Sequence, residues 1–444
     1  MKIHPGEEVL TRLRRSQDPA DEGVTAHVAS CARCQARLVE LPPLPPVASF
    51  RRVIIESYDV AFASSQSFVA QWVSFIERER AEAPSLLAEL IERTGEQREI
   101  LLRNSRRFRT WGLLELAAER GRDACVQNPG QGEELGRLAL KIADFLNVQS
   151  YRATLIADSR TRAWACIANA RRLQSDLSGS EEAFEHAWLH LRKGTGDLLE
   201  RALLMDLQAS LKRDRRQFTE AFRLLQRAVS LFSDLGERHR AGRSLVSLAI
   251  IHNQIGEPLV AAELTRRALR LIDPDWEPRL VLSAHHNLVF YLASAGHFLD
   301  AQGAYREARP LYSRFPDAWT QNRRKWVKGK IARGLGQTGD AESLFLAARD
   351  GFLAEGIPYD TALVSLELAL LYAEQGRTEE LRLLATRLVP IFASRQIHRE
   401  ALAALAFLQR AVEAEKADVE VVERVAEYLR KARHAPDLPF RGSL

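Results

Sequence analysis

The chain has 444 residues, of which 46% are hydrophobic and 27% are charged, and its formal net charge is +5. Its 63 basic and 58 acidic residues are interspersed, as on solvated helix faces, which argues against a dedicated nucleic-acid-binding patch. The sequence has no uninterrupted run of about 18 apolar residues and no apolar N-terminal signal segment. We therefore expect a cytoplasmic protein without a membrane span.

The residue types favour helix along the whole chain. Leu, Ala, Arg and Glu dominate, and all four are good helix formers. Long segments with alternating Val, Ile and Thr, which would indicate strands, do not occur. We predict an all-α protein.

Candidate metal ligands lie in the first 40 residues. His27, Cys31 and Cys34 form the motif H-x3-C-x2-C. On a helix, positions i, i+4 and i+7 share one face, so we expect one helix to direct all three side chains at a single ion. Imidazole and thiolate groups are good zinc ligands, and a structural zinc site takes four ligands.

His4 is the candidate for the fourth ligand. We predict a helix over residues 7–15 and a turn over residues 16–23, where Asp, Pro and Gly are frequent, and these elements would bring His4 back to the motif. Glu7, Glu8 or a water molecule are alternatives for this fourth position. The two cysteines also leave open a redox-active thiol pair, or buried thiols without a function.

The motif and its surroundings resemble a known domain. An upstream His or Cys, the H-x3-C-x2-C motif and an apolar continuation, here QARLVEL, are similar to the zinc-finger domain of zinc-binding anti-sigma factors. The resemblance covers residues 1–40 and implies that His4, His27, Cys31 and Cys34 bind zinc and that the partner is a sigma factor. Between the two helices, this chain has RSQDPADEG where family members often have a DGEL-like turn.

Residues 41–48 include the sequence LPPLPPV, which we interpret as a stiff, extended linker after the zinc unit. The alternative is a P-x-x-P ligand for a recognition domain. Two further cysteines, Cys125 and Cys166, lie far apart in helical sequence, and we expect them to be packed core thiols.

The rest of the chain contains a 40-residue repeat. Its glycines are Gly256, Gly296, Gly336 and Gly376. The small residues that follow in phase are Ala261, Ala301 and Ala341, then Ala268, Ala308 and Ala348, with Leu381 and Leu388 in the last repeat. One period earlier, Ala221 and Ala228 fit the pattern, but Arg216 replaces the glycine. We expect each glycine to end a helix in a left-handed turn, and alanines seven apart to let neighbouring helices approach closely.

Segments such as SLAIIHNQIGEPLVAAELTRRALRL and NLVFYLASAGHFLDAQGAYREARPLY resemble tetratricopeptide repeats. The resemblance implies a right-handed superhelix of helix pairs over residues 49–435, clearest over 200–390, followed by a tail at 436–444. The usual period of that family is about 34 residues, shorter than this one. The additional residues either lengthen a helix or extend a loop.

In tetratricopeptide arrays, the first helices of the repeats line a concave surface that binds peptides. Aligning the repeats on Ala249, Val289 and Gly329 places eight side chains near that surface. They are Arg243, Asn253, His286, Asn287, Arg323, Trp326, Lys330 and Arg333. Such side chains suit an acidic or carboxylate-ended peptide.

No catalytic motif is present: the sequence lacks a P-loop, a dinucleotide-binding G-x-G-x-x-G, a nucleophile elbow and a metalloprotease H-E-x-x-H. We therefore expect no enzyme activity. Two basic clusters, at residues 103–109 and 323–330, lie beside aromatic residues. We interpret them as basic helix faces with the Trp residues in the core, with RNA binding as the alternative.

Two main functions follow. The first is a zinc-dependent transcription regulator of the anti-sigma type, whose repeats bind a second partner. The second is a general scaffold in which zinc serves structure alone. An RNA-binding helical array is a lesser alternative and would show a steep salt dependence.

Overall fold

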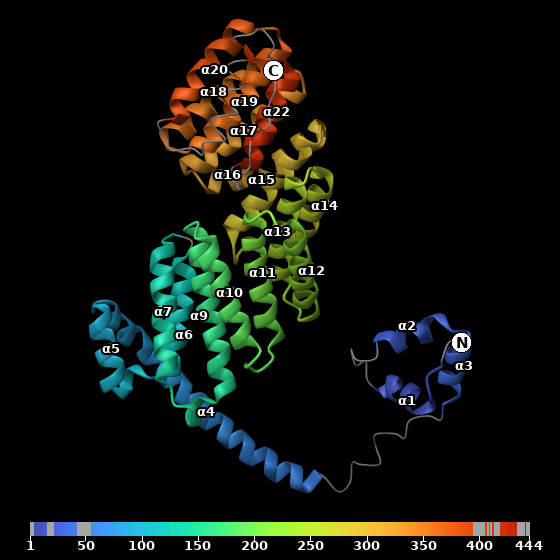
Figure 1. Ribbon diagram of the computed structural model, residues 1–444, viewed down its shortest axis with the longest axis vertical. Helices are drawn as coiled ribbons and strands as arrows, with labels where there is room; N and C mark the ends of the chain where they lie inside the picture. The colour runs from blue at the N-terminus through green and yellow to red at the C-terminus, as the bar shows by residue number, and fades with distance from the viewer. Residues whose placement is uncertain are drawn as a thin grey trace. The chain divides into compact units, whose positions relative to one another are not determined.

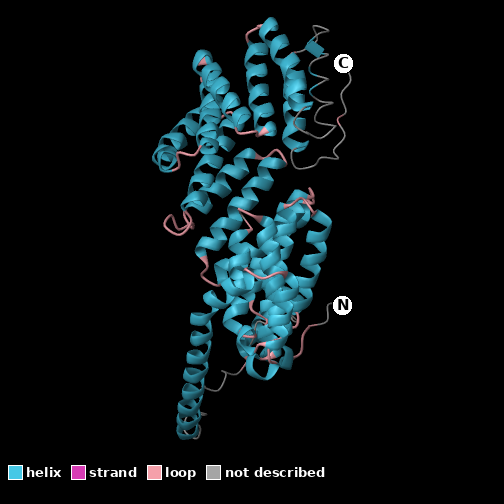
Figure 2. Ribbon diagram, turned by 90° about the vertical axis from the view of Figure 1, so that its left-hand side faces the viewer, coloured by secondary structure: helices cyan, strands magenta, loops and turns pink. Residues whose placement is uncertain are grey.

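The protein is described here by a computed structural model (Figure 1). The structure describes residues 4–15, 22–41, 55–125, 127–393 and 418–432, with residues 405, 408, 411, 412 and 440. Within these residues every regular element is a helix, as Figure 2 shows, and none of the helices is long and apolar enough to cross a membrane. The chain forms two compact units, residues 1–76 and 77–444.

Three short helices make up the described part of the first unit before α4. They are α1 (Glu7–Arg15), α2 (Glu22–Ser30) and α3 (Ala32–Glu40). The predicted helix over residues 7–15 is therefore confirmed. Most of the predicted turn, at residues 16–21, and the predicted linker from residue 42 onward lie outside the described residues.

The long helix α4 (Ile55–Ile91) crosses the boundary between the units, and the buried carboxylate of Glu79 joins its second half to the array. Glu79 accepts hydrogen bonds from the backbone N–H of Trp111, at 2.8 Å, and from the hydroxyl of Tyr151, at 2.6 Å. An acidic group at a helix N-terminus satisfies free N–H donors and complements the helix dipole.

The first part of the array is less regular than the rest. Its elements are α5 (Gly95–Asn104), the 3₁₀ turn η3 (Arg106–Phe108), α6 (Trp111–Ala124), α7 (Pro129–Asp144), α8 (Val148–Tyr151), α9 (Ala153–Leu173) and α10 (Leu177–Leu191). Each of α6, α7, α9 and α10 packs against the next of these four helices, so the array begins before the region where the sequence pattern is clear.

From α11 onward, a helix begins every 20 residues up to α20. The helices are α11 (Leu198–Asp214), α12 (Phe218–Asp234), α13 (Arg238–Gln254), α14 (Pro258–Leu269), α15 (Pro278–Ser294), α16 (Phe298–Arg314), α17 (Ala318–Gly334), α18 (Thr338–Ala354), α19 (Pro358–Glu374) and α20 (Thr378–Ala393), and α22 (Val419–Ala432) follows. Most of them have 17 residues and are joined by three-residue connections. The additional length of the repeat therefore lies in the helices and not in the loops.

The predicted glycine turns are confirmed. Gly256, Gly296, Gly336 and Gly376 have φ angles of 91°, 81°, 73° and 66°. After Gly296, the N–H of His297 donates to the carbonyl of Leu292 at 2.9 Å, which is the long hydrogen bond of a Schellman motif. Arg216 adopts the same conformation, with φ 59°, and stacks its guanidinium on Phe218.

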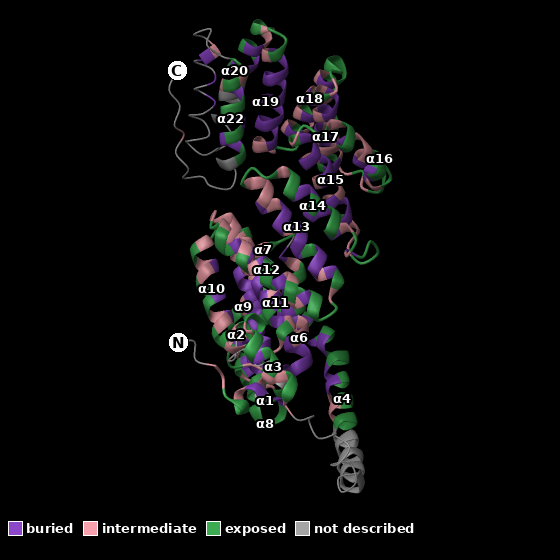
Figure 3. Cartoon of the chain, turned by 90° about the vertical axis from the view of Figure 1, so that its right-hand side faces the viewer, coloured by how far each residue is buried: buried purple, intermediate pink, exposed green. Residues whose placement is uncertain are grey.

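The alanines of the repeat are all buried where helices cross. Ala221, Ala228, Ala261, Ala268, Ala301, Ala308, Ala341 and Ala348 are each 0% exposed. Around them, the core is built from large side chains such as Leu225, Phe345 and Phe352. Figure 3 shows α19 buried along most of its length, because α18, α20 and α22 pack around it.

Candidate metal centre and the repeat surface

Four side chains in the first unit converge on one point. The ligand atoms of His4, His27, Cys31 and Cys34 all lie within 4.8 Å of one another. His4 Nδ1 is 3.3 Å from Cys34 Sγ, 3.7 Å from Cys31 Sγ and 3.4 Å from His27 Nε2. His27 Nε2 is 3.4 Å from Cys34 Sγ. The predicted cluster therefore forms, and its fourth member is His4 and not Glu7 or Glu8.

The prediction that a single helix carries the motif is wrong. Helix α2 ends at Ser30, Cys31 has extended backbone angles (φ −117°, ψ 104°), and α3 begins at Ala32. His27 therefore lies in the last turn of α2, and Cys34 in the first turn of α3. The backbone N–H of Cys34 and of Gln35 both donate to the carbonyl of Cys31, at 3.0 Å, which starts the new helix there.

These spacings match a tetrahedral zinc ion. Zn–N bonds of about 2.0 Å and Zn–S bonds of about 2.3 Å separate two nitrogens by about 3.3 Å and a nitrogen from a sulfur by about 3.5 Å. The observed nitrogen–nitrogen distance is 3.4 Å, and the nitrogen–sulfur distances are 3.3, 3.4 and 3.7 Å. The four residues therefore fit zinc in their chemistry and in these four distances, and their remaining two ligand-atom distances are within 4.8 Å.

The surroundings hold the ligands in position. Cys34 is 0% exposed and packs with Leu10 and Val28, and this burial, together with the neighbouring Cys31 thiol, raises the pKa of Cys34 above its usual value. A bound cation would stabilise the thiolate form that this environment otherwise disfavours. Arg37 of α3 donates to the carbonyl of Pro5 at 3.2 Å and so fastens the segment that carries His4.

Two of the eight residues predicted for the peptide surface are part of the core. His286 is 5% exposed and Trp326 is 9% exposed. His286 Nδ1 lies 2.7 Å from the hydroxyl of Tyr312. Burial, assisted by Arg323, lowers the pKa of His286 well below its usual value, so the ring is neutral at neutral pH. Neither side chain is available to a partner.

The predicted surface cations are mostly paired with carboxylates of a neighbouring helix. Lys330 Nζ lies 2.5 Å from a carboxylate oxygen of Glu367. The guanidinium of Arg333 lies 3.1 Å from the carboxylate of Glu367 and 2.7 Å from that of Glu374. The guanidinium of Arg243 lies 3.6 Å from the carboxylate of Glu277. The list of predicted residues is completed by Arg323, which stacks on Trp319, and by the half-buried Asn253 and Asn287. Lys330 and Arg333 therefore tie α17 to α19.

Three aromatic residues predicted beside the two basic clusters are likewise buried: Phe108 is 0% exposed, and Trp111 and Trp326 are 8% and 9% exposed. Stacking of nucleic-acid bases requires exposed rings. Phe108, Trp111 and Trp326 are therefore part of the core, whereas Trp319, which lies against Arg323 of the second cluster, is 39% exposed.

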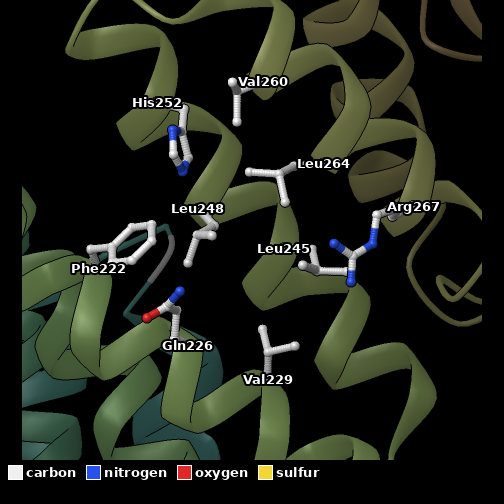
Figure 4. Close-up of a pocket in the computed structure, with 9 residues that line it drawn as sticks. All are labelled: Phe222, Gln226, Val229, Leu245, Leu248, His252, Val260, Leu264 and Arg267. Carbon is white, nitrogen blue, oxygen red and sulfur yellow. The ribbon is translucent and has the colours of Figure 1, made fainter.

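The sequence analysis missed a surface pocket between α12, α13 and α14. Each helix contributes one stripe of side chains at spacings of three or four residues, as Figure 4 shows. The lining residues are Phe222, Gln226 and Val229, then Leu245, Leu248 and His252, then Val260, Leu264 and Arg267. Apolar stripes on three consecutive helices were visible in the sequence, but a core would produce the same pattern.

No family model and no curated protein matches the chain. Among solved structures, a Rap protein complexed with competence and sporulation factor is similar, with 12% identity and a TM-score of 0.55, covering 72% of this chain and 87% of that one. Aspartyl phosphate phosphatase F from Bacillus subtilis is similar with 12% identity and a TM-score of 0.51, covering 86% and 92%. At this identity the likeness shows the fold alone, which is a tetratricopeptide-like helical solenoid.

Proposed function

We infer that this chain is a protein-interaction protein, and specifically a zinc-dependent regulator whose N-terminal unit binds a sigma factor while its repeats bind a second protein. The observation that carries the inference is that the ligand atoms of His4, His27, Cys31 and Cys34 converge on one point, all within 4.8 Å of one another. The resemblance of the motif to the anti-sigma zinc finger supports the choice of partner. Helical solenoids present extended surfaces that suit protein binding, and the proposal assigns the chain no catalytic role.

The part of the N-terminal unit that contains α1 to α3 is small, and its small size explains why it would need a metal. Among its described residues, Leu10, Val28 and Cys34 form the buried centre, with Leu13, Val24 and Leu38 packed around them. A unit of about 40 residues has too little buried surface to fold by itself, and a metal commonly supplies the missing free energy. Zinc binding and folding of this unit are then one event, and the surface that binds the partner exists only when zinc is bound.

The test combines a zinc assay with a binding assay on the full-length chain. The variant Cys31→Ser/Cys34→Ser removes both thiolates, and Cys125→Ser/Cys166→Ser is the matched control in the array. We expect one zinc per chain in the wild type and in the control, and none in the first variant. Sigma factors from the same organism, presented one by one, should bind the wild type and the control but not the zinc-free variant.

Two outcomes would contradict the regulator. If the Cys31→Ser/Cys34→Ser variant retained its zinc, the two cysteines would not be zinc ligands and the proposed metal centre would be wrong. One zinc per chain, with a partner that binds equally well to the zinc-free variant and is not a sigma factor, would favour the scaffold instead. The segment RSQDPADEG differs from the turn that is common in the anti-sigma family, and this difference favours the scaffold.

A further inference from the structure

A cavity of about 330 Å³ opens at the surface between α12 and α14, which are each the second helix of a helix pair (Figure 4). Its floor is α13, the first helix of the pair that α14 completes. Leu245 and Leu248 form its floor and are 3% and 5% exposed. Phe222 and Val229 of α12 form one wall, and Val260 and Leu264 of α14 line the opposite wall. The cavity therefore has an apolar floor and apolar walls, whereas Gln226, His252 and Arg267 make the rest of its lining polar. Its volume lies at the small end of the range for ligand sites.

The rim of the cavity carries one cationic side chain, Arg267, that forms no ion pair with the described residues. Arg267 lines the cavity beside Leu245, and within the described part of the chain its guanidinium has no ion-pair partner. His252 lies at the same rim, but its Nδ1 is 2.7 Å from the carboxylate of Glu257. In contrast to Lys330 and Arg333, which are paired across repeats, Arg267 is free to bind a carboxylate.

The side chains that line the cavity are not kept in the two repeats that follow. Forty residues later, Asp300 and Glu307 stand at the positions of Val260 and Arg267, and His285 stands at that of Leu245. Eighty residues later, the two floor positions are Lys325 and Lys328. The packing of the array thus does not require these lining side chains at the equivalent positions.

We propose that this cavity binds a peptide segment of a protein partner through one large apolar side chain, with an adjacent carboxylate held by Arg267. The floor removes the apolar side chain from water, while the planar guanidinium matches a carboxylate with two parallel hydrogen bonds. The exposed side chains of Leu259 and Val260, which are 50% and 44% exposed, extend the apolar surface beyond the rim. The proposal rests on the proposed function, because it names the chemistry of the partner that the repeats bind.

The next repeat supplies the variants for a test. Arg267→Glu and Val260→Asp introduce the residue types found at Glu307 and Asp300, which the fold tolerates there. Arg223→Glu is the matched control, because Arg223 is an exposed cation of α12 that does not line the cavity. The probe is a library of fluorescein-labelled octapeptides with a central Leu-Glu, Leu-Lys, Ser-Glu or Ser-Lys pair, and binding to the full chain is measured by anisotropy.

The wild type and Arg223→Glu should bind the Leu-Glu peptides about tenfold more tightly than the other three classes, the effect of one charge-assisted contact. Arg267→Glu should shift the preference to Leu-Lys, and Val260→Asp should weaken binding of both Leu classes. Equal binding of all four classes by the wild type would overturn the proposal. So would an unchanged preference for Leu-Glu in Arg267→Glu, which would show that the array binds peptides elsewhere and leave the proposed function standing. The sigma-factor assay above uses the other unit, so it decides the proposed function separately.

Discussion

Gly296 sets the exit direction of α15 through its backbone alone. Its φ of 81° is a conformation that side chains with a Cβ rarely adopt, and an added Cβ would meet no atom within 4 Å. Any loss of stability on substitution is therefore a backbone effect and not a clash.

We expect Gly296→Ala to lower the free energy of unfolding by about 1 kcal/mol, because alanine pays a conformational cost at positive φ. Gly303→Ala is the control, since Gly303 lies inside α16 and an added Cβ there also meets nothing within 4 Å. That change should stabilise the protein by up to about 1 kcal/mol, because alanine favours helix. Urea denaturation measures both values, and equal effects of the two substitutions would contradict the argument.

Glu367 is a buried carboxylate between Lys330 and Arg333. Burial alone would raise its pKa, but the two cations outweigh burial and hold the pKa below its usual value. A depressed pKa in the folded state contributes stability above the unfolded value of about 4.3, and this contribution is lost as the pH falls through the folded value.

We therefore expect Glu367→Gln to destabilise the protein by about 2 kcal/mol at neutral pH, because it leaves Lys330 without its carboxylate partner. The difference from the wild type should be constant above about pH 5 and should shrink in more acidic solution. Glu379→Gln, in the exposed pair with Arg382, is the control and should cost less than about 0.5 kcal/mol. Denaturation at several pH values is the measurement, and a difference that grows on acidification would refute this account.

At the scale of the helix pair, close packing depends on positions without a side chain. Gly329 of α17 lies against the ring of Phe345 in α18, and a Cβ on Gly329 would be 2.7 Å from that ring. Phe345 is 0% exposed and has no room to move aside. The two helices can therefore approach closely only with glycine at this position.

Gly329→Ala should cost about 2 kcal/mol, as overpacked cores do, although alanine is the better helix former. Gly339→Ala, in the first turn of α18, is the control, because an added Cβ meets nothing within 4 Å there. Thermal unfolding of the two variants compares them directly. A Gly329→Ala protein as stable as the Gly339→Ala protein would show that α17 and α18 can separate without cost.

At the scale of the whole molecule, the two units differ in the interactions that stabilise each of them. The array has large clusters of buried side chains along its length, whereas the first unit has a small buried centre and four candidate ligands. Solenoid stability is a sum over repeats and their interfaces, so the array should not depend on a metal in the other unit.

Zinc removal by a chelator should therefore unfold α1 to α3 and leave α13 to α19 intact. Hydrogen exchange followed by mass spectrometry resolves the two units within one chain. Peptides from residues 7–40 should lose protection when the chelator is added and regain it with zinc, while peptides from 238–374 should not change. Retained protection in the first set would mean that the unit folds without metal.

Local signals in the sequence were sufficient to find the repeats and the cluster of candidate metal ligands. A glycine such as Gly296 specifies a left-handed turn by itself, and alanines seven apart specify a close helix crossing. The 40-residue period of the repeat could therefore be found without knowledge of any distant contact. The spacing of His27, Cys31 and Cys34 was likewise informative, although the break at Cys31 was missed, because a short helix and a two-helix corner can bring the same residues together.

The role of each charged or apolar side chain was decided only by the tertiary structure. Lys330 meets Glu367 across 37 residues, so a cation predicted for a partner is instead used between repeats. Arg267, by contrast, forms no ion pair with a carboxylate of the described residues. Cys125 and Cys166 are buried as predicted, but their sulfurs also touch, at 3.7 Å. Helical period shows which face a residue occupies, and only the stacking of the repeats shows what lies opposite that face.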